Sequence, residues 1–455
     1  MMKVIMALAW PTMLEQLLQT AVQYIDTAMV SSLSTQEMAA VGATTTVGWL
    51  IGGMVSAFGV GFLSFIARAC GANDRTAAAR ATAQAVVVTL TVGVLFTAVT
   101  LGLSGLVPVW MQVDADVRPL ATTYFFILYL PMLPRAATII FGTVLRAAGD
   151  TKTPMKVGIW VNLINVVLNF LLIFPTTERT LLGLTFTTPG AGMGVTGAAI
   201  ASAIAVTVGG VYITAVLWRH PMVSPRGQKF RPDWSILRPT FRVALPNMLQ
   251  RFGTSLGYVA FASMINGLGS AATAAHSIAN TVESAFYIPG YGMQTAAATL
   301  AGNAYGAKDA DRMKRLARMF IPIEVGLMIL SGGLLFFLAP PLAGLFAARQ
   351  EPIVRTLVIT VLQMVAVSEP FYGFSIIVEG MMQGVGRTKQ PFIFNVAGMW
   401  LVRILGTWIC TTYFFRDAAS GLIAAWACMI AHNLLLFVLF LICYVRGTWN
   451  PLRDK

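Results

Sequence analysis

The sequence predicts an all-α membrane protein with twelve transmembrane helices, and three observations lead to that fold class. Hydrophobic residues make up 57% of the 455 positions and charged residues only 11%, whereas soluble domains contain about 25% charged residues. Apolar segments of about 20 residues, the length that crosses a bilayer as a helix, recur along the whole chain. The basic residues gather in alternate connections between those segments. So many spans with short connections leave little room for a soluble domain.

The predicted spans follow one another from the first residues to the last. We place them at residues 4–31, 38–67, 84–111, 119–146, 157–175, 197–218, 243–267, 275–304, 320–346, 353–384, 392–415 and 420–445. The first span follows a single lysine and is longer than the apolar core of a signal peptide. We therefore expect it to act as an uncleaved signal.

The distribution of basic residues predicts the orientation. Most of the 31 lysines and arginines lie in connections on one side, above all in the basic stretch at 219–242. Positive residues are retained on the cytoplasmic side of a membrane, so we expect a multi-pass protein of the plasma (inner) membrane with both termini cytoplasmic. The net charge of +13 therefore indicates the lipid bilayer as a partner and requires no nucleic acid.

Two halves of the chain share sequence patterns at near-constant offsets, which is typical of an internal repeat. Residues 71–74 (GAND) match residues 306–309 (GAKD) at an offset of 235. Residues 149–154 (GDTKTP) match residues 386–391 (GRTKQP) at an offset of 237. Because each half holds an even number of spans, the second half enters the membrane from the same side as the first.

The repeat predicts two parallel six-helix lobes related by a pseudo-two-fold axis along the membrane normal. We place the N-lobe at residues 1–220, a cytoplasmic linker at 221–242 and the C-lobe at 243–455. Two lobes of this kind around a central cleft can rock against each other.

The first span carries a stripe of polar residues that ends in a carboxylate. Glu15, Gln19, Gln23 and Asp26 lie at offsets of 0, 4, 8 and 11, which place them on one face of a helix. A carboxylate near the bilayer centre costs on the order of 3 kcal/mol, so it normally faces protein or a water-filled cavity. Asp26 is the strongest candidate for a transport residue, and the alternative is that it reaches the outer headgroups.

Polar residues on one helical face recur in three further spans. Such a face either lines a cavity or forms hydrogen bonds between membrane helices, and the sequence leaves both interpretations open. We predict cavity lining for the eighth span, where a proline favours a kinked helix. The residues are Asn165 and Asn169 in the fifth span; His276, Asn280, Glu283, Tyr287 and Gln294 in the eighth; and Tyr372 and Glu379 in the tenth.

Arg403 lies near the middle of the eleventh span and needs an anionic partner, for which Glu369 and Glu379 are the candidates.

The sequence gives no support for an enzymatic function, because it contains no Walker loop, HExxH or GxSxG motif. The four cysteines show no metal-binding spacing. We therefore predict that the protein is not an enzyme and has no cofactor and no metal site, apart from a transported or coupling ion.

Several of these segments resemble the multidrug and toxic compound extrusion (MATE) family over essentially the whole chain. The resemblance rests on residues 8–30, with Trp10-Pro11 and the run from Tyr24 to Val30, and on the segments at 39–42, 71–75, 145–154 and 197–202. It implies an outward efflux antiporter coupled to H⁺ or Na⁺. A glutamate expected near Thr254 in the NorM-type branch is missing, so the chain is more similar to the DinF-like branch.

The resemblance also implies a cation-coupling site. Asp26 matches the aspartate that accepts the coupling cation, Asn165 a polar position in the fifth helix, and Ser202 a position where some members have threonine. Asn169 departs from the pattern, because several members carry an aspartate there. One carboxylate with neutral oxygens favours H⁺ over Na⁺, although Na⁺ at Asp26, Asn165 and Asn169 stays open.

We expect a monomeric transporter that exports drugs and other lipophilic, often cationic compounds by alternating access. Acidic and aromatic residues favour such substrates through charge and cation–π attraction. The alternative is a lipid-linked oligosaccharide flippase of the same superfamily, which needs a cationic cavity for pyrophosphate. A membrane-embedded transferase needs clustered His and Asp residues, whereas the three histidines of this chain are scattered.

Overall fold

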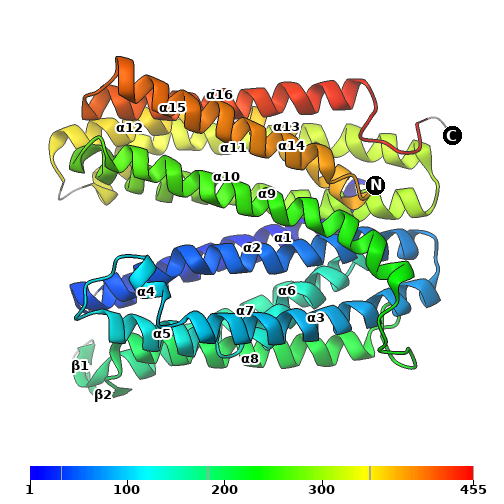
Figure 1. The fold of residues 1–455 in the computed structure, drawn as a ribbon, viewed down its shortest axis with the longest axis horizontal. Coiled ribbons are helices and arrows are strands. Elements are labelled where there is room, and N and C mark those ends of the chain that lie inside the picture. Colours follow the sequence, from blue (N-terminus) through cyan, green and yellow to red (C-terminus); the bar gives the residue numbers. More distant parts are fainter. Residues whose placement is uncertain (32, 182–183, 348–349, 454–455) are drawn as a thin grey trace. The chain divides into compact units, whose positions relative to one another are not determined.

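The computed structural model describes residues 1–31, 33–181, 184–347 and 350–453, and these residues are almost entirely helical. The first half contains α1 (Met2–Ser31), α2 (Thr35–Gly71), α3 (Arg75–Leu103), α4 (Val107–Trp110), α5 (Arg118–Tyr129), α6 (Met132–Ala147), α7 (Lys152–Ile173), the strands β1 (Pro175–Leu181) and β2 (Leu184–Ala191), and α8 (Gly194–Arg219). The second half contains α9 (Trp234–Asn266), α10 (Ser270–Gly306), α11 (Ala310–Phe346), α12 (Pro352–Ala366), α13 (Glu369–Gly384), α14 (Lys389–Ala397), α15 (Leu405–Ile409) and α16 (Ala418–Val445). Figure 1 labels these elements along the chain.

Two of the predicted spans are bent pairs of helices. α5 and α6 meet at 48° around Pro131, and α12 and α13 meet at 51° before Pro370. Proline lacks the amide hydrogen that continues a helix, so it ends or bends one. The helix from α14 to Phe414 is continuous but contains two π-helical stretches, Gly398–Ile404 and Cys410–Phe414.

The structure confirms the predicted all-α fold with twelve long helices. Among the described residues, seven helices are long and apolar enough to span a membrane, or nine when each bent pair counts as one span. The other three are α1, α9 and α10, which are long but carry more polar side chains. The sequence did not predict the antiparallel β1–β2 hairpin between α7 and α8 (Figure 1).

The chain packs as two compact units. One contains residues 1–16, 63–74 and 239–455, and the other contains residues 17–62 and 75–238. α1 and α2 are therefore each divided between the units. The predicted lobes are defined by the sequence repeat and not by packing, so their boundaries stay a prediction.

The same backbone features occur at equivalent positions of the two halves. Asn73 and Lys308, which the repeat aligns, have φ angles of 57° and 55° in the turns that end α2 and α10. Gly149 and Gly386, which it also aligns, have φ angles of 88° and 83° after α6 and α13. Non-glycine residues seldom adopt positive φ, so the repeat extends from sequence to turn geometry.

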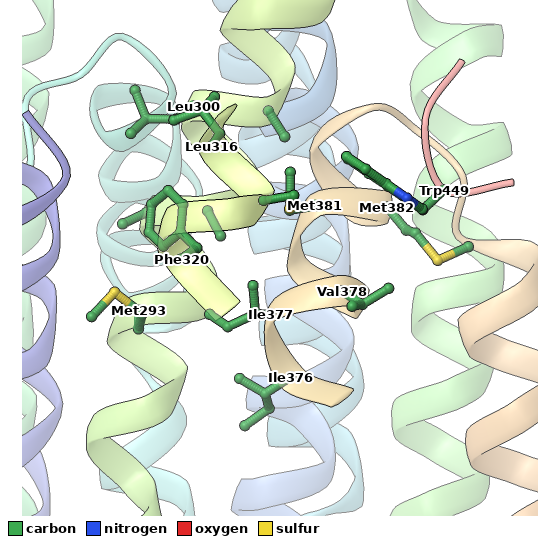
Figure 2. Close-up of a cluster of buried hydrophobic side chains, with 14 of the residues drawn as sticks. Met293, Leu300, Leu316, Phe320, Ile376, Ile377, Val378, Met381, Met382 and Trp449 are labelled. Atoms are coloured by element: carbon green, nitrogen blue, oxygen red, sulfur yellow. The ribbon is translucent and has the colours of Figure 1, made fainter. Parts of the chain in front are cut away.

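One large hydrophobic cluster of the first unit lies where α10, α11 and α13 pack together, and another joins α9, α10, α12 and α16. Figure 2 shows Phe320 and Leu316 facing Ile377 and Met381, with Met293 beside them. Small residues interleave with these large ones, because α10 alone buries alanines and glycines along most of its second half. Small residues allow membrane helices to approach closely.

The predicted linker is not a free tether, because it packs on α3 within the second unit. Asp233 accepts from Arg80 Nη2 at 2.7 Å, and Gln84 donates to the Arg231 carbonyl at 2.9 Å. The pKa of Asp233 is lowered below its ordinary 3.8, first by the hydrogen bond from the Ser235 hydroxyl and then by that from Arg80. These contacts fix the chain as it enters α9.

Candidate functional site

The structure brings Asp26 and Asn169 into contact within the second unit. Asp26 lies in the last third of α1 and is half-buried. Nδ2 of Asn169, on α7, donates to Asp26 Oδ1 at 2.6 Å. That distance is short, as expected for a hydrogen bond to a charged acceptor. Asp26 and Asn169 are far apart along the chain, and the sequence predicts them in the same site. The structure places them in contact.

Asn165 lies one turn before Asn169, and its amide oxygen and nitrogen can be assigned in two ways. In one orientation Nδ2 donates to Ser202 Oγ at 3.0 Å and Oδ1 accepts from Asn169 at 3.3 Å. In the other, the nitrogen donates to the two Asp26 oxygens at 2.9 and 3.1 Å, and the oxygen accepts from Ser202 at 3.0 Å. Amide oxygen and nitrogen are assigned from their partners, and the second orientation satisfies both atoms. Asp26 then accepts from two asparagines, and Ser202 of α8 completes the group.

This group opens into a cavity of about 150 Å³. Its lining residues are Gln23, Asp26, Thr27, Val30, Val41, Thr45, Tyr124, Asn169, Ala198 and Ser202. Pockets for drug-sized ligands measure about 300–1,000 Å³, whereas one water occupies about 30 Å³. The cavity therefore has room for a cation and a few waters but not for a drug.

Tyr124 and Thr45 line the cavity, and the sequence reasoning missed both. Tyr124 lies on α5 and is 9% exposed, and Thr45 lies on α2. Neither belongs to a polar stripe at helical spacing: Thr45 is the middle of three consecutive threonines, and consecutive residues point to different faces of a helix. Their place depends on which helices meet, and that is set by packing.

The other predicted cavity residues are distributed over both units. Gln19 and Gln23 are exposed on α1, and of the two only Gln23 lines the Asp26 cavity. Glu15 is buried, at 7% exposed, in the part of α1 that belongs to the first unit. On α10, Asn280 is exposed and Gln294 is half-buried.

Glu379 on α13 lies in a network of neutral amides in the first unit. Gln250 and Gln383 donate to its Oε1 at 2.8 and 3.0 Å, and Asn395 donates to its Oε2 at 3.3 Å. The Glu379 side chain is buried, at 9% exposed. Buried polar groups normally form hydrogen bonds of this kind. In this structure the hydrogen bonds of Glu379 therefore stabilise the packing of the helices around it.

Three tyrosines form a cluster between α10 and α13. The rings of Tyr291 and Tyr372 each lie edge-on to Tyr287, with centroids 6.1 and 6.0 Å apart. The Tyr291 and Tyr372 hydroxyls are 2.8 Å apart. The cluster includes two predicted cavity residues, Tyr287 and Tyr372, and adds Tyr291, which lies one turn after Tyr287.

Arg403 interacts with aromatic rings and with Glu283. Its guanidinium lies 4.1 Å from the centroid of the Phe261 ring and 4.8 Å from that of Tyr258, and Glu283 on α10 is the carboxyl group whose electrostatics it influences, without an ion pair between them. The interpretation that Glu369 or Glu379 is its partner is wrong. Position along the sequence does not tell which helix face meets Arg403.

The described residues contain no group of three or more His, Cys, Asp or Glu side chains that could hold a metal ion. The oxygens beside Asp26 belong instead to amide and hydroxyl groups. Asn169 Oδ1 is buried and has no hydrogen-bond partner among the described residues. It is therefore available as a ligand.

Comparisons with known proteins agree with this fold. The family model described as MatE matches residues 11–171 and 246–409. The "Probable multidrug resistance protein NorM" of Thermotoga maritima is 27% identical over 448 residues, covering 98% of this chain and 93% of that protein. The crystal structure of MATE in complex with MaL6 matches with a TM-score of 0.90 at 22% identity, covering 100% of this chain and 97% of that chain. These similarities do not distinguish the DinF-like branch.

Proposed function

This chain belongs to the MatE family, and from that premise we propose that it is a cation-coupled multidrug efflux antiporter of the inner membrane. It exports lipophilic, often cationic compounds by alternating access and works as a monomer with both termini in the cytoplasm. Its relatives carry the name multidrug resistance protein, which supports multidrug efflux. The observation that carries the coupling proposal is the Asp26 group with its small cavity.

The coupling cation binds at Asp26. Its oxygens accept from Asn169 at 2.6 Å and, in the satisfied orientation, from Asn165. These donors hold the carboxylate in the absence of a cation, and a cation must displace or turn at least one of them. The unpartnered Asn169 Oδ1 and the Ser202 hydroxyl then supply neutral oxygens.

We propose H⁺ as the coupling ion in preference to Na⁺. Hard cations are bound by carboxylate, amide and hydroxyl oxygens, and this site offers a single carboxylate. A proton needs only that carboxylate, whereas Na⁺ also needs the neutral oxygens to turn toward it. Na⁺ coupling would engage Asp26 together with Asn165, Asn169 and Ser202.

The drug binds elsewhere, because the Asp26 cavity of about 150 Å³ is below the size of a drug pocket. We propose that the predicted residues of the C-terminal half line the drug path. Tyr287 and Tyr372 present aromatic rings and Glu283 a buried carboxyl group. Rings and carboxylates favour organic cations.

Coupling between cation and drug is reciprocal. A cation that weakens drug binding must itself bind more weakly when drug is present. Neutralisation of Asp26 removes the charged acceptor of the asparagine amides and so changes how α1 packs on α7. The cation-bound and the drug-bound protein therefore have different helix packings, and one protein molecule adopts only one of them at a time.

Proteoliposome transport tests the proposal. Ethidium or norfloxacin movement is measured under an imposed pH gradient or an imposed Na⁺ gradient, for the wild type and Asp26→Asn. Asp116→Asn, at an exposed carboxylate of the same unit, is the matched control. Transport that is driven by the pH gradient alone, lost in Asp26→Asn and kept in the control supports H⁺ antiport.

The other outcomes reject parts of the proposal. Transport driven by Na⁺ alone would replace H⁺ by Na⁺ at the same site. Transport that survives Asp26→Asn would remove Asp26 from coupling. No drug movement under either gradient would favour the lipid-linked oligosaccharide flippase.

A further inference from the structure

A groove lies between α7 and α8 on the exposed surface of the second unit. It measures about 370 Å³ and is lined by four residues of α7 and three of α8, all of them aliphatic, aromatic or glycine. Trp160, Val208 and Tyr212 line the groove and are exposed. Pockets that hold small ligands measure about 300–1,000 Å³. The groove shares no lining residue with the Asp26 cavity, so the proposed cation site does not account for it.

The close, antiparallel packing of α7 and α8 forms this groove (Figure 1). A Cβ atom built on Gly197 would lie 2.6 Å from the Leu172 carbonyl oxygen, and one built on Gly209 would overlap Val161 Cγ2. Residue numbers therefore rise along α8 as they fall along α7. Gly209 is buried and has no side chain, so it forms the floor of a hollow between the larger side chains of the two helices.

Two basic residues lie beyond the groove, toward the start of α7 and the end of α8. Lys156 lies one turn before Trp160, and Arg219 lies two turns after Tyr212. Spacings of four and seven residues keep side chains on one helical face. Both basic side chains are exposed, and neither forms an ion pair with another described residue. Because the helices are antiparallel, both charges lie at the same end of the groove.

Basic residues outnumber acidic ones at this end of the groove. Asp150, in the connection before α7, accepts from the Thr153 N–H at 3.0 Å and from the Thr153 hydroxyl at 2.6 Å. Lys152, Lys156 and Arg219 outweigh this single carboxylate. The end of the groove therefore attracts an anionic group and repels a cationic drug.

The groove lies at the depth of one leaflet of the bilayer. Its α7 lining residues fall between positions 157 and 164, about 8–18 Å along a helix that begins at Lys152. The hydrocarbon core of a bilayer is about 30 Å thick, so the acyl chains of the leaflet on this side reach the groove. By the positive-inside prediction this leaflet is cytoplasmic. Basic pockets between transmembrane helices on that side bind anionic head groups.

We propose that this groove binds a bilayer phospholipid with an anionic head group. One acyl chain lies along the groove against Trp160 and Tyr212, and the head group contacts Lys156 and Arg219. The uncharged lining of the groove fits the chain, and the basic residues at its end fit the anion. The inference does not rest on the proposed function, because it requires only that α7 and α8 span the membrane.

Native mass spectrometry of the purified full chain in detergent tests the charge of the ligand. Dioleoyl phosphatidylglycerol, which is anionic, and dioleoyl phosphatidylcholine, which is zwitterionic, are titrated separately, and the Kd of the first bound lipid is measured. The wild type should bind phosphatidylglycerol more tightly. Lys156→Gln with Arg219→Gln should weaken that binding about 25-fold, because each basic residue near an anionic lipid contributes about fivefold. Arg75→Gln with Lys314→Gln is the matched control, since it removes two exposed charges elsewhere and should leave the Kd unchanged.

Val208→Trp tests the groove itself, because it fills the groove and leaves the basic residues in place. Val208 is exposed, so the larger side chain does not enter the core. Phosphatidylglycerol binding should weaken about tenfold or more, since the loss of two buried methylene groups already has that effect. Val211→Trp is the matched control, because Val211 is exposed on α8 and does not line the groove.

Several results would overturn the proposal. Equal Kd values for the two lipids in the wild type, or equal losses in the two double charge variants, would mean that the chain attracts anionic lipid without a site. Unchanged binding in Val208→Trp would place the lipid elsewhere. Ethidium binding that is lost in Val208→Trp, with no preference for the anionic lipid, would assign the groove to a drug. If Val208→Trp does not fold, the charge variants alone can still refute the proposal.

Discussion

Asn169→Ala is expected to change the affinity for the coupling cation in a direction that depends on which cation is used. The amide donates to Asp26 at 2.6 Å, and its oxygen is buried without a partner among the described residues. A hydrogen bond to a charged group contributes about 1.5–3 kcal/mol, and each 1.4 kcal/mol is about tenfold in a binding constant. Loss of a donor that competes with H⁺ should lower the half-maximal H⁺ concentration for efflux about 10- to 100-fold. If Na⁺ is the coupling ion, loss of an oxygen ligand should instead raise the half-maximal Na⁺ concentration.

The assay is drug movement in proteoliposomes as a function of H⁺ or Na⁺ concentration at fixed drug. Asn162→Ala is the matched control, because Asn162 lies two turns earlier on α7 and its Nδ2 has no described partner. It should leave both concentration dependences unchanged. A variant Asn169→Ala with unchanged H⁺ and Na⁺ dependences would refute the assignment of Asn169 to the coupling site.

Three further predictions concern stability. Glu37→Ala should lower the free energy of unfolding by about 1–3 kcal/mol in thermal unfolding, because Glu37 Oε1 accepts from the Val195 N–H at 3.1 Å; an unchanged Tm would contradict this. Glu324→Met should raise Tm, since a 0% exposed carboxyl group with no described partner costs about 1–3 kcal/mol; a lowered Tm would mean that the group is satisfied. The pKa of Asp233 in the folded protein lies below the ordinary 3.8, so its pairing with Arg80 stabilises the linker above pH 3.8. This stabilisation is lost as the pH falls through the pKa of the folded protein. Limited proteolysis of the linker that is already faster at pH 5 would contradict this.

The helices were predictable because each has to be long and apolar. Segment length and hydropathy placed all twelve, including α1, α9 and α10, whose polar side chains weaken the apolar signal. The bends before α6 and α13 occur at prolines, but the angles of 48° and 51° depend on packing. The β1–β2 hairpin has no signal of comparable strength in its threonine-rich sequence.

The polar group around Asp26, which we propose as the coupling site, was predictable only in part. Asp26, Asn165 and Asn169, which the structure brings together, were singled out because polar residues inside apolar spans are costly and therefore few. Ser202 came from the family resemblance alone, and the structure places it 3.0 Å from Asn165. Tyr124 is an ordinary aromatic residue of a membrane helix until packing brings it to the cavity.

The size of the coupling cavity restricts how cation and drug can compete. A space of about 150 Å³ is smaller than a drug-sized pocket, so on the proposed function the cation at Asp26 and the drug occupy different places. On that proposal their competition acts through alternative packings of the helices. α1 is suited to connect them, since its N-terminal half belongs to one compact unit and the segment with Asp26 to the other. Thr12 holds one end through the Gly292 carbonyl, and Asn169 holds the other through the Asp26 carboxylate. A cation that alters the second contact therefore acts on a helix whose first contact is with α10, the helix that carries Glu283 and Tyr287 of the proposed drug path.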